Sequence, residues 1–435
     1  MGKVIAPNPL PIDLFWNFRR REPNELNTLK AARAAYFWTA QQRTGTASMI
    51  RRGMGWLDRV PRDIVKNTWA FGPEARSVYG RSISGQISDQ WRLYRSTGAP
   101  SEYYYHAGGP GMSEQDWSRL ISFNLYESVI GFCTDSAALH DGHLRIGLKS
   151  EFHAAARKYS LHCAETLATL NPDEAVDDDL ANQLLSSFFL KPDNGSSGSD
   201  AERWRRVGGE FELASSDKRI PKDLMPDYLR ARATKLGRRM IVQRLVENSS
   251  AIQLWAGPAL STMRIDTIKP SDAAPFVSRV AYRVPGSMTS SVDNFHQGGA
   301  AFPMDVETGI LGLGADQVPG GQRHALTHSP ATGARVAGEE LPGWAAACEL
   351  ACRLHENLTG VISVGWDLGL TDDGPVAIEA NFPPGLDGIC QYWFDGFLGS
   401  TICATLVAEI KLKLAATLPP ESRFQVGADW RGPTS

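Results

Sequence analysis

The chain has 435 residues, of which 42% are hydrophobic and 21% charged, and its formal net charge is −3. This is the composition of a globular protein with two or three domains, and the charge gives no overall positive field that would attract nucleic acid or an anionic membrane. No apolar run approaches the roughly 20 residues of a membrane-spanning helix. Prolines also interrupt the N-terminal segment where a signal peptide would need an unbroken apolar helix.

Six cysteines are scattered along the chain, and no two of them have the C-x-x-C spacing of a zinc site. This pattern indicates a reducing environment, so we expect a cytoplasmic protein.

The first 145 residues are expected to form a separate, partly helical region. Good helix formers fill residues 26–42. Residues 101–117, SEYYYHAGGPGMSEQDW, have the composition of a glycine-rich loop followed by a helix start, with Ser113 in a capping position before Asp116. The three tyrosines at 103–105 either line a ligand site or pack in the core or in an edge strand.

The rest of the chain alternates helices and strands. We expect helices at 149–167, 343–358 and 398–416, and strands at 186–192, 238–248, 260–268 and 277–285, the last two as neighbours. Residues 296–335 are dense in glycine and proline and are expected to form turns and a lid. This mixture predicts an α+β or α/β fold.

Residues 364–388, VGWDLGLTDDGPVAIEANFPPGLDG, place polar residues in two otherwise apolar strands. A three-residue loop at 372–374 would set Leu368 opposite Ile378 and Asp367 opposite Glu379, because side chains alternate between the two faces of a strand. A two-residue loop at 373–374 would mix the faces. We therefore expect a hairpin with one apolar face and one oxygen-rich face.

The oxygen-rich face of this hairpin would carry Asp367, Glu379 and Asn381. Hard oxygen ligands of this kind suit Mg²⁺, which is commonly held by one or two carboxylates together with substrate phosphates. The alternative is that the polar face only meets water.

A second motif lies earlier, where the strand FFLKP at 188–192 runs into the loop DNGSSGS at 193–199. Backbone N–H groups of such a loop can cradle phosphate, with Lys191 supplying a positive charge. A flexible linker explains the same residues equally well.

The two motifs, in this order, resemble the ATP-grasp superfamily, which pairs a lysine-bearing strand and a mobile glycine-rich loop with a later Asp…Glu-x-Asn hairpin. The stretch VDNFHQGG at 292–299, with the GWD and IEAN of the hairpin, is similar to the sugar-transfer-associated branch of that superfamily. The resemblance covers roughly residues 149–415. Two positions depart from the usual pattern: Leu148 precedes Lys149 where aspartate is usual, and Arg244 replaces a common acidic residue.

The resemblance implies an α+β ATP-grasp fold, in which two α+β subdomains clasp ATP, behind a largely helical N-terminal extension. The implied boundaries are 1–145 for the extension, 146–244 for the first subdomain, 245–420 for the second subdomain and 421–435 for a C-terminal tail.

The resemblance also implies roles for individual residues. ATP would be bound by Lys149, Lys191, Gly195, Ser196, Ser197, Gly198, Gln243, Arg244, Leu245 and Glu247. One or two Mg²⁺ ions would be held by Asp367, Glu379 and Asn381. The implied catalytic residues are Arg264, Arg283, Asn294 and His296, and the implied substrate-binding residues are Gly298 and Gly299.

The activity implied is that of an ATP- and Mg²⁺-dependent carboxylate–amine ligase, which would form an amide or peptide bond through an acyl phosphate. Its substrates would be a small carboxylate and an amine, in cell-surface sugar or natural-product biosynthesis. Two alternatives remain, a phosphotransferase acting on a hydroxyl group and a non-catalytic nucleotide-binding module. Replacing Asp367 or Glu379 with alanine is expected to remove ATP turnover and leave the fold intact.

Overall fold

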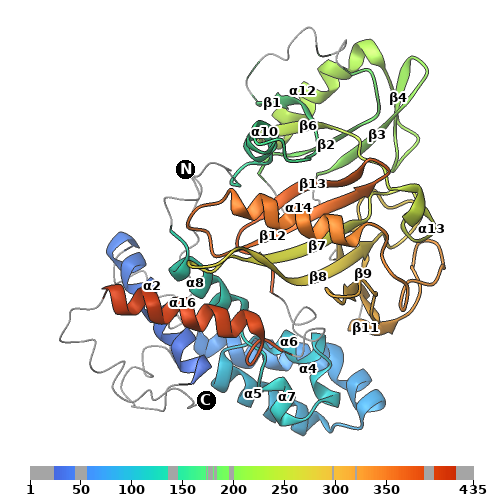
Figure 1. Cartoon of the computed structure of the whole chain (residues 1–435). Coiled ribbons are helices and arrows are strands. Elements are labelled where there is room, and N and C mark those ends of the chain that lie inside the picture. The colour runs from blue at the N-terminus through green and yellow to red at the C-terminus, as the bar shows by residue number, and fades with distance from the viewer. Residues whose placement is uncertain are drawn as a thin grey trace. The chain divides into compact units, whose positions relative to one another are not determined.

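The computed structural model describes residues 24–44, 56–135, 146–172, 174, 180, 184–194, 200–295, 298–318, 321–386 and 396–417. The chain divides into two compact units (Figure 1). The first comprises Met1–Asp135, Pro270–Asp272 and Leu386–Ser435, and the second comprises Ser136–Lys269 and Ala273–Gly385. In the part of the chain that the structure describes, no helix is both long and apolar enough to cross a membrane.

The first unit is built from helices, as expected for the N-terminal region. They are α2 (Glu25–Thr44), α4 (Trp56–Tyr79), α5 (Ile83–Thr97), α6 (Ser101–His106), the short 3-10 turn η1 (Gly109–Gly111), α7 (Glu114–Trp117), α8 (Phe123–Cys133) and α16 (Thr401–Thr417). Helix α2 confirms the helix predicted at 26–42, and α16 confirms the one predicted at 398–416. The predicted cap is also present, because the Ser113 side chain accepts a hydrogen bond from the Asp116 N–H at the start of α7.

The tyrosines at 103–105 lie in helix α6 and not in a loop or an edge strand. All three are buried, and each hydroxyl donates to a partner: Tyr103 to the Leu386 carbonyl, Tyr104 to Asp89, and Tyr105 to the side-chain oxygen of Gln86. A buried tyrosine needs such a partner for its hydroxyl, which explains why three adjacent tyrosines can share a packed helix. The predicted loop is wrong for residues 101–106, whereas packing in the core, one of the alternatives for these tyrosines, is confirmed.

The first sheet of the second unit has six antiparallel strands in the order β1-β6-β2-β3-β4-β5. They are β1 (Thr166–Leu170), β2 (Phe188–Pro192), β3 (Glu202–Val207), β4 (Glu210–Leu213), β5 (Arg219–Pro221) and β6 (Met240–Arg244), with η2 (Lys222–Leu224), α10 (Lys149–Lys158) and α12 (Met225–Leu236). The predicted strands at 186–192 and 238–248 are confirmed as β2 and β6. The helix predicted at 149–167 is shorter, since it ends at Lys158 and residues 166–170 form β1.

The second sheet has seven strands in the order β11-β10-β9-β8-β7-β12-β13. They are β7 (Thr262–Ile268), β8 (Phe276–Val284), β9 (Ala300–Met304), β10 (Gly314–Val318), β11 (Gly321–Leu326), β12 (Ser363–Thr371) and β13 (Gly374–Asn381), with η3 (Ser250–Ile252), α13 (Gln253–Ala256) and α14 (Trp344–Glu356). Helix α14 lies against this sheet (Figure 1). Its apolar residues, including Leu350 and Leu354, pack with Trp366 and Leu368 in one core.

Two predictions for this second sheet had different outcomes. The neighbouring strands predicted at 260–268 and 277–285 are β7 and β8, which pair directly. The turns and lid predicted at 296–335 are in part three strands, β9 to β11. Glycine and proline density misled the prediction, because β9 is held by long-range pairing with β8, from Val280 opposite Met304 to Val284 opposite Ala300.

The β12–β13 hairpin has the predicted pairing of Asp367 with Glu379, although its loop is different. Thr371 pairs with Gly374, so only two residues form the turn, and the predicted pairing of Leu368 with Ile378 is wrong because Leu368 lies opposite Ala377. The register is restored by a bulge at Ile378, which has no partner between the pairs Asp367–Glu379 and Leu368–Ala377. A bulge of this kind adds one residue to one strand and re-aims the side chains beside it.

Candidate active site

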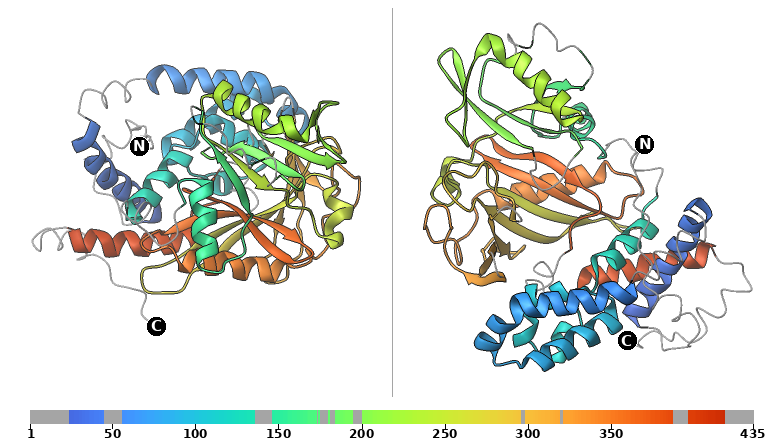
Figure 2. Two further views of the ribbon diagram at one scale, coloured as in Figure 1. Left: turned by 90° about the horizontal axis from the view of Figure 1, so that it is seen from above. Right: turned by 180° about the vertical axis from the view of Figure 1, so that it is seen from behind.

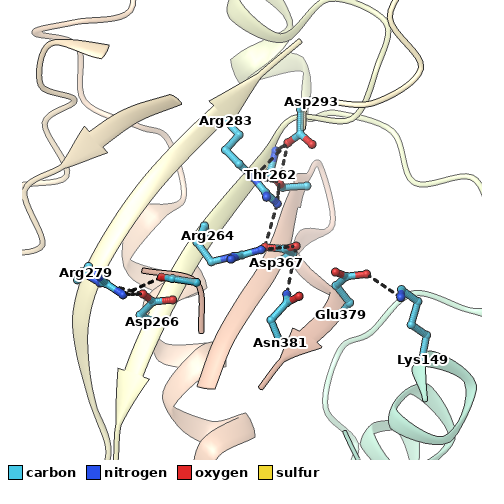
Figure 3. Close-up of polar contacts among 11 residues, drawn as sticks. Lys149, Thr262, Arg264, Asp266, Arg279, Arg283, Asp293, Asp367, Glu379 and Asn381 are labelled. Carbon is cyan, nitrogen blue, oxygen red and sulfur yellow. Dashed lines mark hydrogen bonds and ion pairs between the residues drawn. The ribbon is translucent and has the colours of Figure 1, made fainter. Parts of the chain in front are cut away.

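The centre of the candidate site is the buried carboxylate of Asp367, which two arginines share (Figure 3). Arg264 lies opposite it on the neighbouring strand β7 and makes two contacts, from Nε to Oδ1 at 2.6 Å and from Nη2 to Oδ2 at 3.1 Å. Arg283 of β8 reaches Oδ1 at 2.9 Å. The Asn381 amide lies 3.4 Å from Oδ2.

These contacts decide the protonation state of Asp367. Burial alone would raise the pKa of this carboxyl, but the charges and hydrogen bonds of Arg264 and Arg283 outweigh burial and hold the pKa well below its usual range. Asp367 is therefore ionised at neutral pH, and it orients both guanidinium groups.

Arg283 has a second anchor on the far side from Asp367. Its Nε and Nη2 donate to the Thr262 hydroxyl at 3.0 and 2.6 Å, and its Nε lies 3.8 Å from the Asp293 carboxylate. Asp293 in turn accepts from the Thr262 N–H and hydroxyl. The arginine is thus held between two buried carboxylates with Thr262 as the connecting group.

The residues predicted to frame the acceptor, from Asn294 to Gly299, directly follow Asp293. The Gly299 N–H donates to the Asn294 carbonyl, and a Cβ at Gly299 would lie 2.3 Å from the Asp293 carbonyl oxygen. Gly298 has φ +90°, a conformation that favours glycine. The structure therefore places Asn294, Gly298 and Gly299 in a tight turn next to Asp293, while His296 lies outside the described residues.

Glu379 faces the first sheet, where it contacts Lys149 at 3.3 Å (Figure 3). Lys149 begins helix α10, whose first turn is capped by Asp193 through the Ser150 N–H and hydroxyl. Lys191 of β2 is buried, and burial lowers its pKa to about 8 even though the charge of Glu379 opposes the shift. Two lysines from the first sheet region thus lie near the hairpin of the second.

The residues predicted to bind the adenosine end of ATP lie at the end of strand β6 and just beyond it. Gln243 is buried in the strand, and Leu245 just beyond it donates its N–H to the Ser187 carbonyl. Arg244 and Glu247 are both exposed, and Arg244 pairs with Glu165. Strand β6 lies between β1 and β2, and these four residues do not join the Asp367 contacts described above. The loop residues Gly195, Ser196, Ser197 and Gly198 lie outside the described residues.

His153 is a site residue that sequence analysis missed. Its Nε2 lies 2.8 Å from the carbonyl of Ile378, the bulge residue, and its Nδ1 lies 2.8 Å from the Thr166 hydroxyl. Because a carbonyl can only accept, Nε2 carries the proton and Nδ1 accepts from Thr166. Burial lowers the pKa of His153 to about 3, so the ring is neutral. Its position four residues after Lys149, on the same helix face, was the available signal.

The residues present fit Mg²⁺ as the nucleotide's counter-ion. Among the described residues, no three His, Cys, Asp or Glu side chains are grouped so as to hold a metal ion. Asp367, Glu379 and Asn381 instead offer two carboxylates and one amide oxygen from two paired strands. That set is the size Mg²⁺ uses when substrate phosphates complete its shell.

The family model for sugar-transfer-associated ATP-grasp proteins matches residues 143–393, more than half of the chain. The chain belongs to the sugar-transfer-associated ATP-grasp family. The matched segment contains both sheets and every residue of the site described above, so the α+β ATP-grasp fold expected from the sequence is confirmed. The comparison with curated protein sequences finds no match.

Solved structures of ATP-grasp enzymes resemble this family member only distantly. The D-alanine-D-alanine ligase from Coxiella burnetii is 9% identical, with 65% of this chain and 62% of that chain covered and a TM-score of 0.37. The L-amino acid ligase from Bacillus licheniformis is 11% identical, covering 65% and 50%, with a TM-score of 0.36. The N5-carboxyaminoimidazole synthase from Aspergillus clavatus is 15% identical, covering 65% and 58%, with a TM-score of 0.32.

The chain spans less than two thirds of each of these three proteins. At these TM-scores the superpositions carry no information about its own reaction.

The two carboxylates of the hairpin are expected to differ in their effect on stability, which revises the expectation that both can be removed without cost to the fold. Asp367→Ala should lower the free energy of unfolding by about 3–5 kcal/mol, because it leaves two arginines without their shared buried carboxylate. Glu379→Ala should lower it by about 1 kcal/mol or less, since Glu379 is partly exposed. Urea unfolding of both variants measures the difference, and equal losses would contradict the arginine-bridged geometry.

Proposed function

We propose that the protein is an ATP- and Mg²⁺-dependent carboxylate–amine ligase that forms an amide bond through an acyl phosphate. Its substrates are a small-molecule carboxylate and an amine, in cell-surface sugar or natural-product biosynthesis, and we place it in the cytoplasm. The observation that carries the proposal is a charged cluster in which four cations meet three carboxylates, namely Lys149, Lys191, Arg264 and Arg283 with Asp293, Asp367 and Glu379.

The sign of this cluster suits a polyanionic substrate. Cations exceed carboxylates, so the cluster favours phosphates over a bare metal ion. Phosphoryl transfer needs positioning and neutralisation of charge more than covalent chemistry by the protein. Lys149 and Lys191 would hold the α- and β-phosphates as point charges. Gln243, Arg244, Leu245 and Glu247 would hold the adenosine end.

Arg264 and Arg283 would neutralise the phosphoryl group in transfer. A substrate carboxylate oxygen forms the new bond to the γ-phosphorus as the bond to the ADP oxygen breaks. The amine then attacks the acyl carbon, phosphate leaves, and the amine nitrogen loses a proton. Because Asp367 fixes both guanidinium planes before the substrate arrives, little reorganisation is needed at the moment of transfer.

Bound Mg²⁺ supplies further neutralisation of the β- and γ-phosphates. Asp367, Glu379 and Asn381 would hold it. The turn at Asn294, Gly298 and Gly299 would frame the acceptor, with His296 beside it. Closure of residues 195–199 over ATP would exclude water that hydrolyses the acyl phosphate.

Product analysis tests the reaction class. We expect purified protein with ATP, Mg²⁺ and pooled carboxylates and amines to release phosphate and to yield a condensed mass, read by mass spectrometry, and Glu379→Gln to abolish both products. ADP with one phosphate added to a hydroxyl compound would replace the ligase with a phosphotransferase. Thermal stabilisation by Mg·ATP without turnover would leave a nucleotide-binding module.

Replacing His153 should impair turnover without changing the charged residues. His153→Leu removes the donor to the Ile378 carbonyl, so the Mg²⁺ concentration for half-maximal turnover should rise or kcat should fall, by between about tenfold and 100-fold. His355→Leu is the matched control. Its buried ring makes the same two kinds of contact, with the Thr267 hydroxyl at 2.7 Å and the Val361 carbonyl at 3.0 Å. If both variants lost melting temperature to a similar extent and had the same kinetics, His153 would have only a packing role.

The affinity for ATP should depend on pH through Lys191. Its pKa of about 8 in the free protein lies below the ordinary lysine value because the side chain is buried. Lys191 is charged below this pH and loses its proton above it, so the dissociation constant for ATP should rise by up to about tenfold per pH unit there. Titrations between about pH 7 and pH 10 measure this, and Lys191→Arg should remove the rise because a guanidinium stays protonated. A profile unchanged by this replacement would count against phosphate binding by Lys191.

A further inference from the structure

The helix pair α4 and α5 of the first unit exposes large apolar side chains. Val65 and Trp69 of α4 are 64% and 86% exposed, and Ile87 and Trp91 of α5 are 40% and 37% exposed. Single exposed apolar residues are common, but a contiguous group marks an interaction surface. Whether these four form one group depends on how the two helices face each other.

The two helices pack antiparallel, as their side-chain contacts show. Gln90 of α5 donates from Nε2 to the Thr68 hydroxyl of α4 at 2.8 Å, and Gln86 donates to the Gly72 carbonyl at 3.1 Å. Position 68 therefore meets 90, and position 72 meets 86. Both helices can be followed in Figure 1 and in the right-hand view of Figure 2.

This register brings the exposed apolar residues to one side of the pair. The reference positions are the facing residues 68 of α4 and 90 of α5. Trp69 and Trp91 each come one residue after the reference position of their helix, and Val65 and Ile87 each come three residues before it. In two antiparallel helices, residues at the same sequence offset from a facing pair point to the same side of the helix pair. Val65, Trp69, Ile87 and Trp91 therefore form one surface, which we call the α4–α5 face.

Exposed cations border the α4–α5 face. By the same rotation Arg76 of α4 and Arg95 of α5 turn toward it, and Lys66 lies at its outer edge. Among the acidic side chains that the structure describes on these helices, Asp63 and Glu74 turn away from the face. The third, Asp89, is buried and paired with Arg81. The face is thus aromatic at its centre and positive at its border.

We propose that the α4–α5 face binds the surface of a membrane that contains anionic lipids. Tryptophan suits the headgroup level of a bilayer because its ring is apolar and its N–H is polar. The aliphatic side chains beside it would reach the acyl boundary, while the bordering cations meet lipid phosphates. The charge of the whole chain is negative, so the attraction depends on local cations such as those that border this face. The proposal is independent of the reaction catalysed.

Vesicle co-sedimentation of the full chain tests the proposal. We expect binding to vesicles of phosphatidylcholine and phosphatidylglycerol in equal amounts, and much weaker binding to phosphatidylcholine alone or at high salt. Trp69→Ser should weaken binding about tenfold. Arg76→Gln should weaken it about fivefold.

Matched controls come from the second unit. Leu254→Ser replaces a side chain that is 70% exposed on α13, and Lys235→Gln removes an exposed cation on α12. Both should bind vesicles as the unmodified chain does, and all four variants should keep its melting temperature. Absence of binding to anionic vesicles, or unchanged binding by Trp69→Ser, would overturn the proposal. So would a dimer that Trp69→Ser converts to a monomer in light scattering, because a second copy would then cover the face.

Discussion

The shared carboxylate of Asp367 is the interaction on which the rest of the site depends. A buried carboxylate between two guanidinium groups is expensive to desolvate, and it persists only where the partners supply charge and good hydrogen-bond geometry. The pairing of β12 with β7 and of β7 with β8 provides that geometry, because it places Arg264 on the strand next to Asp367 and Arg283 on the strand beyond it. The sheet thus orients two cations toward the region where the hairpin presents its oxygen atoms.

A second constraint links the two halves of the second unit. The bulge at Ile378 allows Glu379 to face Asp367, and it leaves a carbonyl that needs a partner outside the ladder. His153 supplies that partner from helix α10, which also carries Lys149 to Glu379. Helix α10 therefore both supports the hairpin through His153 and places the positive charge of Lys149 beside it.

The local pattern of the sequence predicted the pairing of Asp367 with Glu379, because these residues interrupt apolar alternation and one apolar face was required. The loop and the pairing of Leu368 with Ile378 were wrong, because a shorter turn with a bulge also brings Asp367 opposite Glu379, and alternation alone cannot separate the two arrangements. The metal-binding role of Asp367, Glu379 and Asn381 stays a prediction. His153 was missed because its partner is distant in sequence; Ile378 is 225 positions from His153. The strands β9 to β11 were missed because the glycine and proline density of residues 296–335 is typical of turns. The α4–α5 face was not predicted either, because the net charge of the whole chain says nothing about a few cations that lie close together on one surface. The roles of His296 and of residues 195–199 stay predictions.

The most direct test of the central claim is to locate the metal and the nucleotide on the protein. Crystals grown with a non-hydrolysable ATP analogue and Mn²⁺ in place of Mg²⁺ would reveal the metal by its anomalous scattering. The account predicts Mn²⁺ within coordination distance of Glu379 and of Asp367 or Asn381, with the phosphates against Lys149 and Lys191. A metal bound away from the hairpin, or a nucleotide that leaves both lysines uncontacted, would contradict it.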